Sequence, residues 1–319
     1  MQGTEAERTE TGQAERAVIV HCHMFKNAGS TLDWSLNRNF GGRFLQLWND
    51  PDGRTEDQQL ESLLHDREDL CAISGHRLSP PFPVVAGVKL LPAFILRNPI
   101  ERAYSVYCFE RDQADVTPGS RQAKRLSFRD YIRWRMDPGK PLALRNFQSA
   151  FCAGKRRARD PAKIFEQALQ NLRAAPLVAT LELYDSCMVL FERTLRPYFG
   201  GLDLSHVKQN VGRYRDGAST SAPKMSVLRK ILARTAISAR VQKDPDVNFR
   251  VNRTLELLGS EVGDLLVAGN QYDLKLYAEA TALVNQRLRA LENFDLELQH
   301  FARRCASLNS QLQSTAVSS

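Results

Sequence analysis

Long apolar runs are absent from this sequence of 319 residues. No stretch approaches the ~20 consecutive apolar residues that a membrane-spanning helix needs. The first 16 residues are polar and contain four Glu. A signal peptide would start with basic residues and continue with an apolar stretch, so we expect a loose tail at 1–16 and no signal peptide.

Cysteine is scarce as well. Six cysteines are too few for a disulfide scaffold, and no two of them form a C-x-x-C pair. We therefore expect neither a zinc ribbon nor a thioredoxin-type redox site. Apolar residues make up 43% of the chain and charged residues 25%, which indicates a globular protein rather than a disordered or fibrous one. The length suits one large α/β domain or two ordinary ones.

Acidic residues are in deficit, with 36 Asp and Glu against 44 Lys and Arg. The whole excess of eight positive charges falls in the segment 208–253, which has 11 basic residues and three acidic ones. The rest of the chain balances at 33 against 33. The excess charge thus belongs to one basic insertion. It does not indicate nucleic-acid binding. It would be either a docking surface for an anionic acceptor or membrane face, or a solvated loop followed by an amphipathic helix at 227–237.

Short runs typical of buried strands alternate with helical patterns along most of the chain. The runs are at 17–20, 72–74, 93–96 and 176–181, and each is rich in β-branched or other apolar residues. Strands that alternate with helices indicate a parallel sheet with helices on both faces. We therefore predict an α/β fold around one central parallel sheet.

The same patterns place the helices. One helix is expected to begin near Ser30 and to end at Gly41. Its buried face would carry Leu32, Leu36 and Phe40. Further helices are expected around 60–64, 99–107, 127–136, 142–152, 161–173 and 185–195.

The chain from Tyr272 onward is strongly helical in pattern. Apolar residues between 284 and 312 recur mostly at three- and four-residue spacing. That spacing fits a short coiled coil, which would make a homodimer, and fits a helix that packs on its own domain equally well. The expected divisions are a tail at 1–16, a domain at 17–285 with the basic insertion at 208–253, and a C-terminal helix at 286–319.

The segment 26–31 lies between the first strand and the first helix. A turn that leads into a helix N-terminus presents unpaired backbone N–H groups, and with the helix dipole these form an anion site. Gly29 allows the backbone to approach a phosphate closely, and Lys26 adds a positive charge. The Walker A pattern G-x-x-x-x-G-K-[ST] is absent, because the lysine here precedes the glycine. The alternative is an ordinary helix cap at Ser30 or Thr31 with a solvated lysine.

A second cationic motif follows the strand at 93–96. Arg97 stands at the carboxyl end of that strand, on the edge where open α/β sheets bind ligands. Ser105 lies about two turns into the next helix, with Arg102 three residues before it on the same face. An arginine and a hydroxyl together bind phosphate, whereas a surface pair of Arg102 with Glu101, or of Arg97 with a carboxylate, would contribute little. With the first motif, this one predicts two anionic groups on one ligand.

These residues carry a family resemblance. The segment 23–32 (HMFKNAGSTL) resembles the 5′-phosphosulfate loop of carbohydrate sulfotransferases of the Golgi-type, heparan 2-O-sulfotransferase-like branch. The segment 95–107 resembles their 3′-phosphate motif. Phe25 stands where the family usually has proline, and Asn27 where threonine is common. Weaker similarities follow in family order at 74–76, 146–148, 181–185, Asn210 and 273–277.

The resemblance implies a P-loop-like three-layer α/β/α sandwich with a helical C-terminal extension. It also implies transfer of a sulfuryl group from 3′-phosphoadenosine 5′-phosphosulfate (PAPS) to a hydroxyl, without a metal. Lys26 would stabilise charge on the leaving phosphate oxygen. The residues implied in donor binding are Lys26, Asn27, Ala28, Gly29, Ser30, Thr31, Arg97 and Ser105, with Arg102 as a helper.

A general base must take the proton from the acceptor hydroxyl. We assign this role to His76, which follows a predicted strand and a glycine and titrates near neutral pH. Glu182 is the reserve candidate, and a structural hydrogen bond is the alternative for His76. His21 and His23 share one strand face, but the sequence offers no evident third metal ligand, so we expect them to pack or to support the site.

The acceptor implied by the resemblance is a glycan or glycolipid, with a small molecule still open, and no nucleic acid is expected as a partner. Peripheral membrane contact would run through 208–253. Eukaryotic relatives usually carry an N-terminal membrane anchor, which this sequence lacks, so we expect a bacterial cytoplasmic enzyme, with a truncated Golgi-lumenal domain as the alternative. Two other functions stay open, namely a P-loop nucleotide kinase or NTPase and a non-enzymatic nucleotide-binding scaffold.

Overall fold

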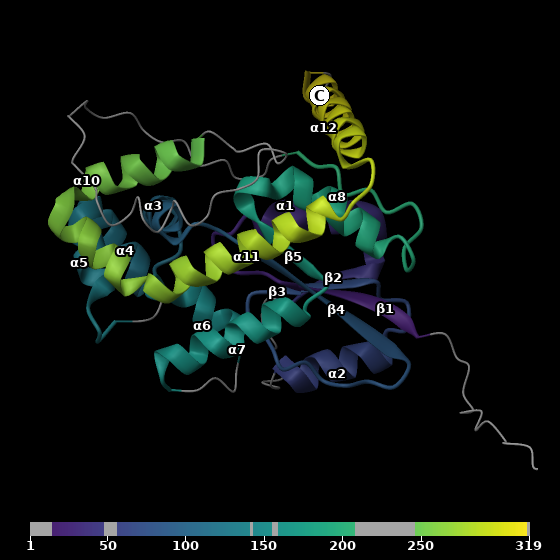
Figure 1. Cartoon of the computed structure of the whole chain (residues 1–319), viewed down its shortest axis with the longest axis horizontal. Helices are drawn as coiled ribbons and strands as arrows, with labels where there is room; N and C mark the ends of the chain where they lie inside the picture. The colour runs from purple at the N-terminus through teal and green to yellow at the C-terminus, as the bar shows by residue number, and fades with distance from the viewer. Residues whose placement is uncertain (1–14, 48–55, 141–142, 155–158, 208–245, 318–319) are drawn as a thin grey trace, which may run out of the picture.

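The computed structural model describes residues 15–47, 56–140, 143–154, 159–207 and 246–317 (Figure 1). Most of the basic insertion lies outside these ranges, as do Asn210 and the amphipathic helix expected at 227–237. The tail expected at 1–16 also lies almost wholly outside them. The last eight residues of the insertion are described, and they belong to a helix that begins at Asp246.

Five parallel strands form the central sheet, in the order β2-β3-β1-β4-β5. Every neighbouring pair is parallel. The predicted α/β fold with a central parallel sheet is thus confirmed. The strands are β1 (Arg16–Cys22), β2 (Phe44–Leu47), β3 (Ala72–Gly75), β4 (Val88–Leu96) and β5 (Leu177–Thr180).

Helices fill the connections and the C-terminal part of the chain. The helix expected near Ser30 runs from Gly29 to Phe40, and its three expected core residues are buried. The helix expected at 142–152 begins only at Phe147. The helices are α1 (Gly29–Phe40), α2 (Glu56–Asp66), α3 (Pro99–Asp112), α4 (Pro118–Arg125), α5 (Phe128–Met136), α6 (Phe147–Ala153), α7 (Pro161–Ala174), α8 (Tyr184–Leu195), α10 (Asp246–Gly269), α11 (Gln271–Arg289) and α12 (Phe294–Val317).

Alternate residues of β1 face two different apolar clusters. Val18 and Val20 pack with Leu60 of α2, whereas Ile19 belongs to the cluster that contains Leu32 of α1. Figure 1 shows α2 on one side of the sheet and α1 and α8 on the other. Both faces are therefore covered, which is the usual reason why parallel strands are apolar throughout.

A further apolar cluster joins α3, α5 and α10 beyond the end of β4. Its buried members include Ile100 of α3, Ile132 of α5 and Leu258 of α10. Sequence patterns did not predict α10, which contains a kink at Gly259 with φ 71°. This packing matters for the site, because it brings a helix from residues 246–269 against the helix that follows β4.

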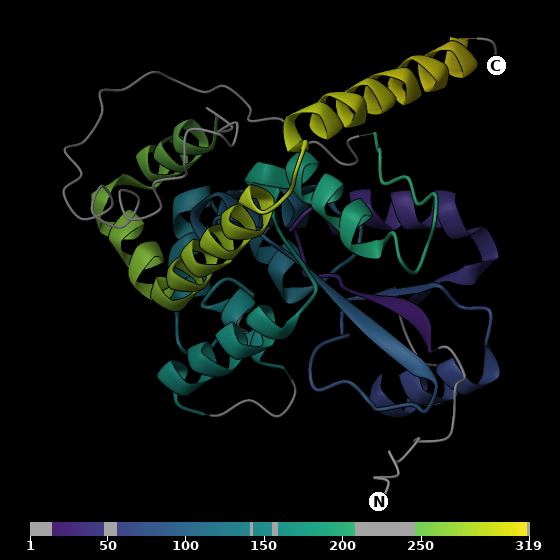
Figure 2. The same cartoon turned by 45° about the vertical axis from the view of Figure 1, so that its right-hand side comes forward.

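The C-terminal region contains two helices. The boundary expected at 285/286 falls inside α11, and α12 starts at Phe294. Phe301 of α12 is fully buried in the main core, whereas Leu312 is 47% exposed on the part of α12 that projects from the body in Figure 2. The near half of α12 therefore packs on its own domain. Within the described ranges, no helix has the length and apolar content to cross a bilayer.

The strand order changes direction at β1. The chain moves from β1 to β2 and β3 on one side and to β4 on the other. In open α/β sheets, ligands bind at the carboxyl ends of the strands where the order reverses. The loops that follow β1 and β4 are neighbours at this point, and they carry the two cationic motifs.

Candidate anion-binding site

The loop between β1 and α1 has an unusual backbone. Lys26 and Ala28 both have φ 63°, in the left-handed region that non-glycine residues seldom adopt. Ala28 is the N-cap of α1 and makes no side-chain capping hydrogen bond. A left-handed residue followed by right-handed helix turns successive N–H groups toward one point, and such a concavity binds anions. The loop backbone is therefore of a kind that can hold an anion, and the phosphate cradle stays a prediction.

Gly29 is required here for a reason that the sequence did not reveal. A Cβ atom at this position would lie 2.3 Å from Cδ2 of His23 and 2.5 Å from its Nε2. The His23 ring thus packs directly on the first residue of α1. Glycine at this position leaves room for the His23 ring. It would also allow a ligand to approach the backbone closely.

Asn27 faces inward rather than toward solvent. Its Nδ2 donates to the carbonyl oxygen of Ile95 at 2.8 Å and to Oε1 of Gln148 at 2.7 Å. Gln148 Oε1 also accepts from the backbone N–H of Arg97 at 2.9 Å, and Gln148 Nε2 donates to the Arg97 carbonyl at 2.9 Å. The Gln148 carboxamide therefore joins the loop after β1 to the end of β4. The backbone N–H of Asn27 donates to the Met24 carbonyl at 3.3 Å, so this expected donor-binding residue shapes the loop instead of facing a ligand.

Gln148 is itself held by a reciprocal pair of helix caps. Oδ1 of Asn146 accepts from the backbone N–H groups of Tyr272 and Asp273, at the start of α11. The buried carboxylate of Asp273 accepts from the backbone N–H groups of Gln148 and Ser149 at 2.9 and 2.7 Å, at the start of α6. Each helix thus supplies the side chain that caps the other.

Arg102 lies beneath the first loop. Its Nε donates to the carbonyl oxygen of Phe25 and its Nη1 to that of Ala143, each at 3.0 Å. Its guanidinium also stacks on Phe147, 4.2 Å from the ring centroid. Burial lowers the pKa of Arg102 to about 10. The structure therefore places this expected phosphate helper as a buried brace of the loop.

Arg97 connects both motifs. Its Nη1 donates to the carbonyl oxygen of Lys26 at 3.2 Å, and its Nη2 lies 2.7 Å from Oε1 of Glu101. The carboxylate of Glu101 is only 2% exposed, so this is a buried ion pair and not the weak surface pair that the sequence allowed. Ser105 is half-buried one turn beyond Glu101 on α3. Arg97 and Ser105 thus lie on either side of one buried acid.

The ammonium group of Lys26 lies 4.6 Å from the centroid of the Phe109 ring. Burial and the positive charge of Arg97 lower the pKa of Lys26 below its usual value. Nη1 of Arg97 also bonds to the Lys26 carbonyl, so the two side chains belong to one region. An anion placed between them would relieve the repulsion.

His76 has the hydrogen bond that a neutral base needs. Its Nδ1 is 2.8 Å from the carbonyl oxygen of His23, and since a carbonyl only accepts, Nδ1 carries the proton. The lone pair of the neutral ring is then on Nε2. Burial lowers the pKa of His76, which keeps this basic form present below pH 6.5. His76 lies just after the end of β3, with its ring partly covered and the residue as a whole still open to solvent.

Glu182 lies just after the end of β5, as His76 lies just after the end of β3. Its Oε1 accepts from the backbone N–H of Asn98 at 3.2 Å, and its Oε2 is buried with no hydrogen-bond partner among the described residues. Burial and the nearby charge of Glu101 raise the pKa of Glu182 to about 7. The reserve candidate is thus a carboxyl that also titrates near neutral pH.

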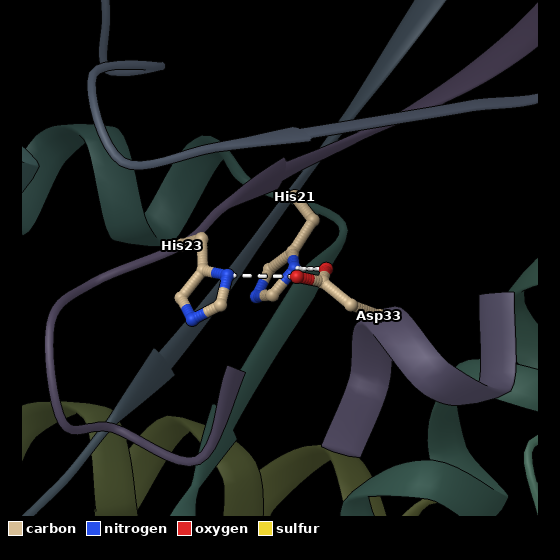
Figure 3. A group of neighbouring side chains, drawn as sticks. All are labelled: His21, His23 and Asp33. Atoms are coloured by element: carbon tan, nitrogen blue, oxygen red, sulfur yellow. Dashed lines mark hydrogen bonds and ion pairs between the residues drawn. The ribbon is translucent and has the colours of Figure 1, made fainter. Parts of the chain in front are cut away.

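Asp33 of α1 joins His21 and His23, as Figure 3 shows. Its Oδ1 lies 2.6 Å from Nδ1 of His21, and its Oδ2 lies 2.8 Å from Nδ1 of His23. The three ligand-type atoms lie within 4.8 Å of one another, so Asp33 is the third residue that the sequence did not identify. The contacts have hydrogen-bond lengths, and they explain the burial of all three side chains without an ion.

The charge state of this cluster follows from its contacts. Burial alone would raise the pKa of Asp33, but the two imidazoles bring it well below its usual range. Burial lowers the pKa of His23, although the hydrogen bond to Asp33 opposes this effect. Asp33 therefore stays ionised and fixes the His23 ring. The backbone carbonyl of His23 in turn accepts from Nδ1 of His76 and orients that ring. The signal for Asp33 was its position one turn into the helix after a His-x-His strand end.

The segments that resembled the sulfotransferase pattern meet in space. Gly75 ends β3 beside the end of β1, and Gln148 joins the loops after β1 and β4. Glu182 contacts the residue after Arg97, and Asp273 holds the start of α6. Pieces separated by up to 250 residues in the chain thus surround one strand edge.

No protein-family model matches the chain. The chain is 30% identical over 205 residues to an uncharacterized protein of Archaeoglobus fulgidus. The alignment covers 61% of this chain and 80% of the archaeal one. The two proteins belong to one family. This relationship carries no activity with it.

Replacement of Gly29 by Ala should disturb the loop without changing any charge. Because the new Cβ would overlap the His23 ring, we expect a loss of about 1–3 kcal/mol in the free energy of unfolding. Urea denaturation of the variant measures this loss. Gly42→Ala is the matched control, since a Cβ there meets nothing within 4 Å. Equal stability of the two variants would contradict the close packing of His23 on α1.

Proposed function

We propose that the protein is a sulfotransferase that moves the sulfuryl group of PAPS to a hydroxyl of a carbohydrate or glycolipid. The observation that carries this proposal is the joining of two cationic loops at adjacent strand ends. Gln148 bonds to both Asn27 and Arg97, so the loops form one site with two places for anionic groups. A ligand with phosphate groups at two separate positions matches this arrangement.

The first loop suits the 5′ end of the donor. The uncapped first turn of α1 and the left-handed Ala28 direct backbone N–H groups toward one anion. Ser30 is exposed at the same turn. The side chain of Thr31 is buried and its backbone N–H donates to the Ala28 carbonyl at 3.1 Å, so Thr31 would shape the turn and leave the anion to Gly29 and Ser30. Lys26 would neutralise charge on the phosphate oxygen that leaves.

The second loop suits the 3′-phosphate. Arg97 is 15% exposed and offers a guanidinium, and Ser105 offers a hydroxyl one turn beyond Glu101. Arginine binds phosphate through parallel charge-assisted hydrogen bonds, which gives direction as well as affinity. The 3′-phosphate would thus anchor the nucleotide while the reaction takes place at the other loop.

Sulfuryl transfer requires little covalent chemistry from the protein. The acceptor oxygen forms a bond to sulfur while the bond between sulfur and the 5′-phosphate oxygen breaks. The electron pair of the broken bond goes to the phosphate, and the products are a sulfate ester and adenosine 3′,5′-bisphosphate. The protein contributes by positioning and by preorganised positive charge. Nε2 of His76 would accept the hydroxyl proton, and Asp33 and His23 would hold that imidazole in place.

Replacement of Lys26 by Ala should nearly abolish turnover, by about 10²–10³-fold, because it removes the charge that stabilises the leaving oxygen. Arg97→Ala should weaken donor binding by about 10-fold or more, because it removes charge-assisted bonds to phosphate. The measurement is product mass spectrometry after incubation with labelled PAPS and a panel of cell-envelope glycans. Lys163→Ala, at an exposed position of α7, is the control and should keep full turnover.

The Lys26→Ala and Arg97→Ala variants also distinguish a sulfotransferase from a non-enzymatic scaffold. A non-enzymatic scaffold would show no transfer that depends on Lys26. Wild-type turnover by both Lys26→Ala and Arg97→Ala on a confirmed acceptor would show that the site assignment is wrong.

The pH profile identifies the base. A base acts when deprotonated, so kcat/KM falls as the pH drops through its pKa. With His76 in this role, the fall should come below pH 6.5, since burial lowers the pKa of that residue. His76→Asn should lose activity, and Glu182→Gln should keep the wild-type profile. A fall centred near pH 7 that disappears in Glu182→Gln would give the role to Glu182 instead, whose pKa is about 7.

A further inference from the structure

The aromatic ring of Phe109 lies beside the first loop, although neither sequence motif contains this residue. Phe109 is in the third turn of α3 and is 41% exposed. The ammonium group of Lys26 lies 4.6 Å from the centroid of its ring. A cation within about 6 Å of an aromatic ring centroid is attracted by the negative face of the ring. An isolated exposed phenylalanine needs no explanation, but this one contacts the lysine to which we assign the leaving oxygen.

Phe25 supports the ring of Phe109. The centroids of the two rings are 5.3 Å apart, and their planes meet edge to face at 78°. The carbonyl oxygen of Phe25 accepts from Nε of Arg102 at 3.0 Å, and Arg102 is only 1% exposed. Arg102 and Phe109 are seven residues apart and therefore share one face of α3. This face thus fixes the backbone of Phe25, and the ring of Phe25 packs against that of Phe109.

The backbone of Lys26 is fixed as well. The N–H of Asn27 donates to the carbonyl of Met24 at 3.3 Å, which closes a turn with Phe25 and Lys26 at its centre. Lys26 has φ 63° in this turn, at a position that usually takes glycine or asparagine. Its carbonyl oxygen accepts from Nη1 of Arg97 at 3.2 Å. Two adjacent residues of one braced turn therefore contact the same ring.

The partner of the Lys26 ammonium is an uncharged ring and not an acid. Among the residues that the structure describes, no carboxylate lies within ion-pair distance of this ammonium. A carboxylate would hold the lysine but would also oppose its charge at the point where an anion binds. An aromatic face attracts the ammonium and leaves its full charge available. A long side chain that is already held also loses less freedom when a ligand binds.

We propose that Phe109 is a positioning residue for Lys26, which holds the ammonium group at the first loop while a 5′-phosphate binds there and does not neutralise it. The inference rests on the proposed function and adds a residue from outside both motifs. It also gives a role to Phe25, which stands where the resembled family usually has proline. The ring of Phe25 supplies the edge-to-face contact that keeps Phe109 beside Lys26.

A calorimetric double-mutant cycle tests this role without an acceptor. Adenosine 3′,5′-bisphosphate and adenosine 3′-monophosphate, which differ only in the 5′-phosphate, are titrated into the full chain, Lys26→Ala, Phe109→Leu and the double variant. Phe109→Leu should lose about 2- to 10-fold of the affinity for the bisphosphate, because the ligand must then order the lysine itself. It should keep its affinity for the monophosphate. In the Lys26→Ala background, Phe109→Leu should cause no further loss, since the two residues act as a pair.

Two further variants serve as controls. Phe109→Tyr keeps an aromatic face and should keep the wild-type affinity for the bisphosphate. Phe249→Leu makes the matched change at a 64% exposed position of α10 and should leave both affinities unchanged.

Unchanged or tighter binding of the bisphosphate by Phe109→Leu would overturn the inference, since the ring would then be idle or would compete with the anion for the ammonium. An equal loss for both ligands, a loss that persists in the Lys26→Ala background, or an equal loss in Phe109→Tyr would also overturn it. Phe109 would in those cases act through the fold or on the ligand directly. Failure of the unchanged protein to bind the bisphosphate would overturn the proposed function itself.

Discussion

The carboxamide of Gln148 is the interaction on which the site depends. Its oxygen accepts from the Asn27 side chain and from the backbone of Arg97, and its nitrogen donates to the Arg97 carbonyl. A buried amide that meets all these partners is costly to disturb, because each group left unpaired costs about 1–3 kcal/mol. The reciprocal caps of α6 and α11 keep this amide in place. The ends of β1 and β4 therefore behave as one rigid edge.

That rigidity allows like charges to be held close together. Lys26 and Arg97 lie at the strand ends where the strand order reverses, with Arg97 Nη1 bonded to the Lys26 carbonyl, and Arg102 braces the first loop from below. In water these groups would separate, and in the folded protein the helices and the backbone carbonyls hold them. A site with fixed positive charge and open access stabilises an anion without reorganisation. We propose that a doubly anionic ligand uses this place.

Much of this was predictable from local sequence. The buried strands and the helices after them follow from apolar periodicity, and the loop at 26–31 follows from the order of lysine, glycine and hydroxyl residues. What local sequence could not supply is long-range contact. β2 has only four residues, and α10 adjoins the basic insertion and is broken at Gly259, so neither stands out by periodicity. The role of Asp33 follows only from the two histidines that the fold brings to it, and Arg102 changes from an expected ligand contact to a buried brace for the same reason.

The central claim is that the two loops together form a site for a nucleotide with phosphates at its 3′ and 5′ positions. Calorimetric titration of the unchanged chain with adenosine 3′,5′-bisphosphate and, in parallel, with ATP and Mg²⁺ tests it most directly. The account predicts one binding site per chain with clear preference for the bisphosphate. Clear preference for ATP with Mg²⁺ would contradict it and would favour a nucleotide kinase or NTPase.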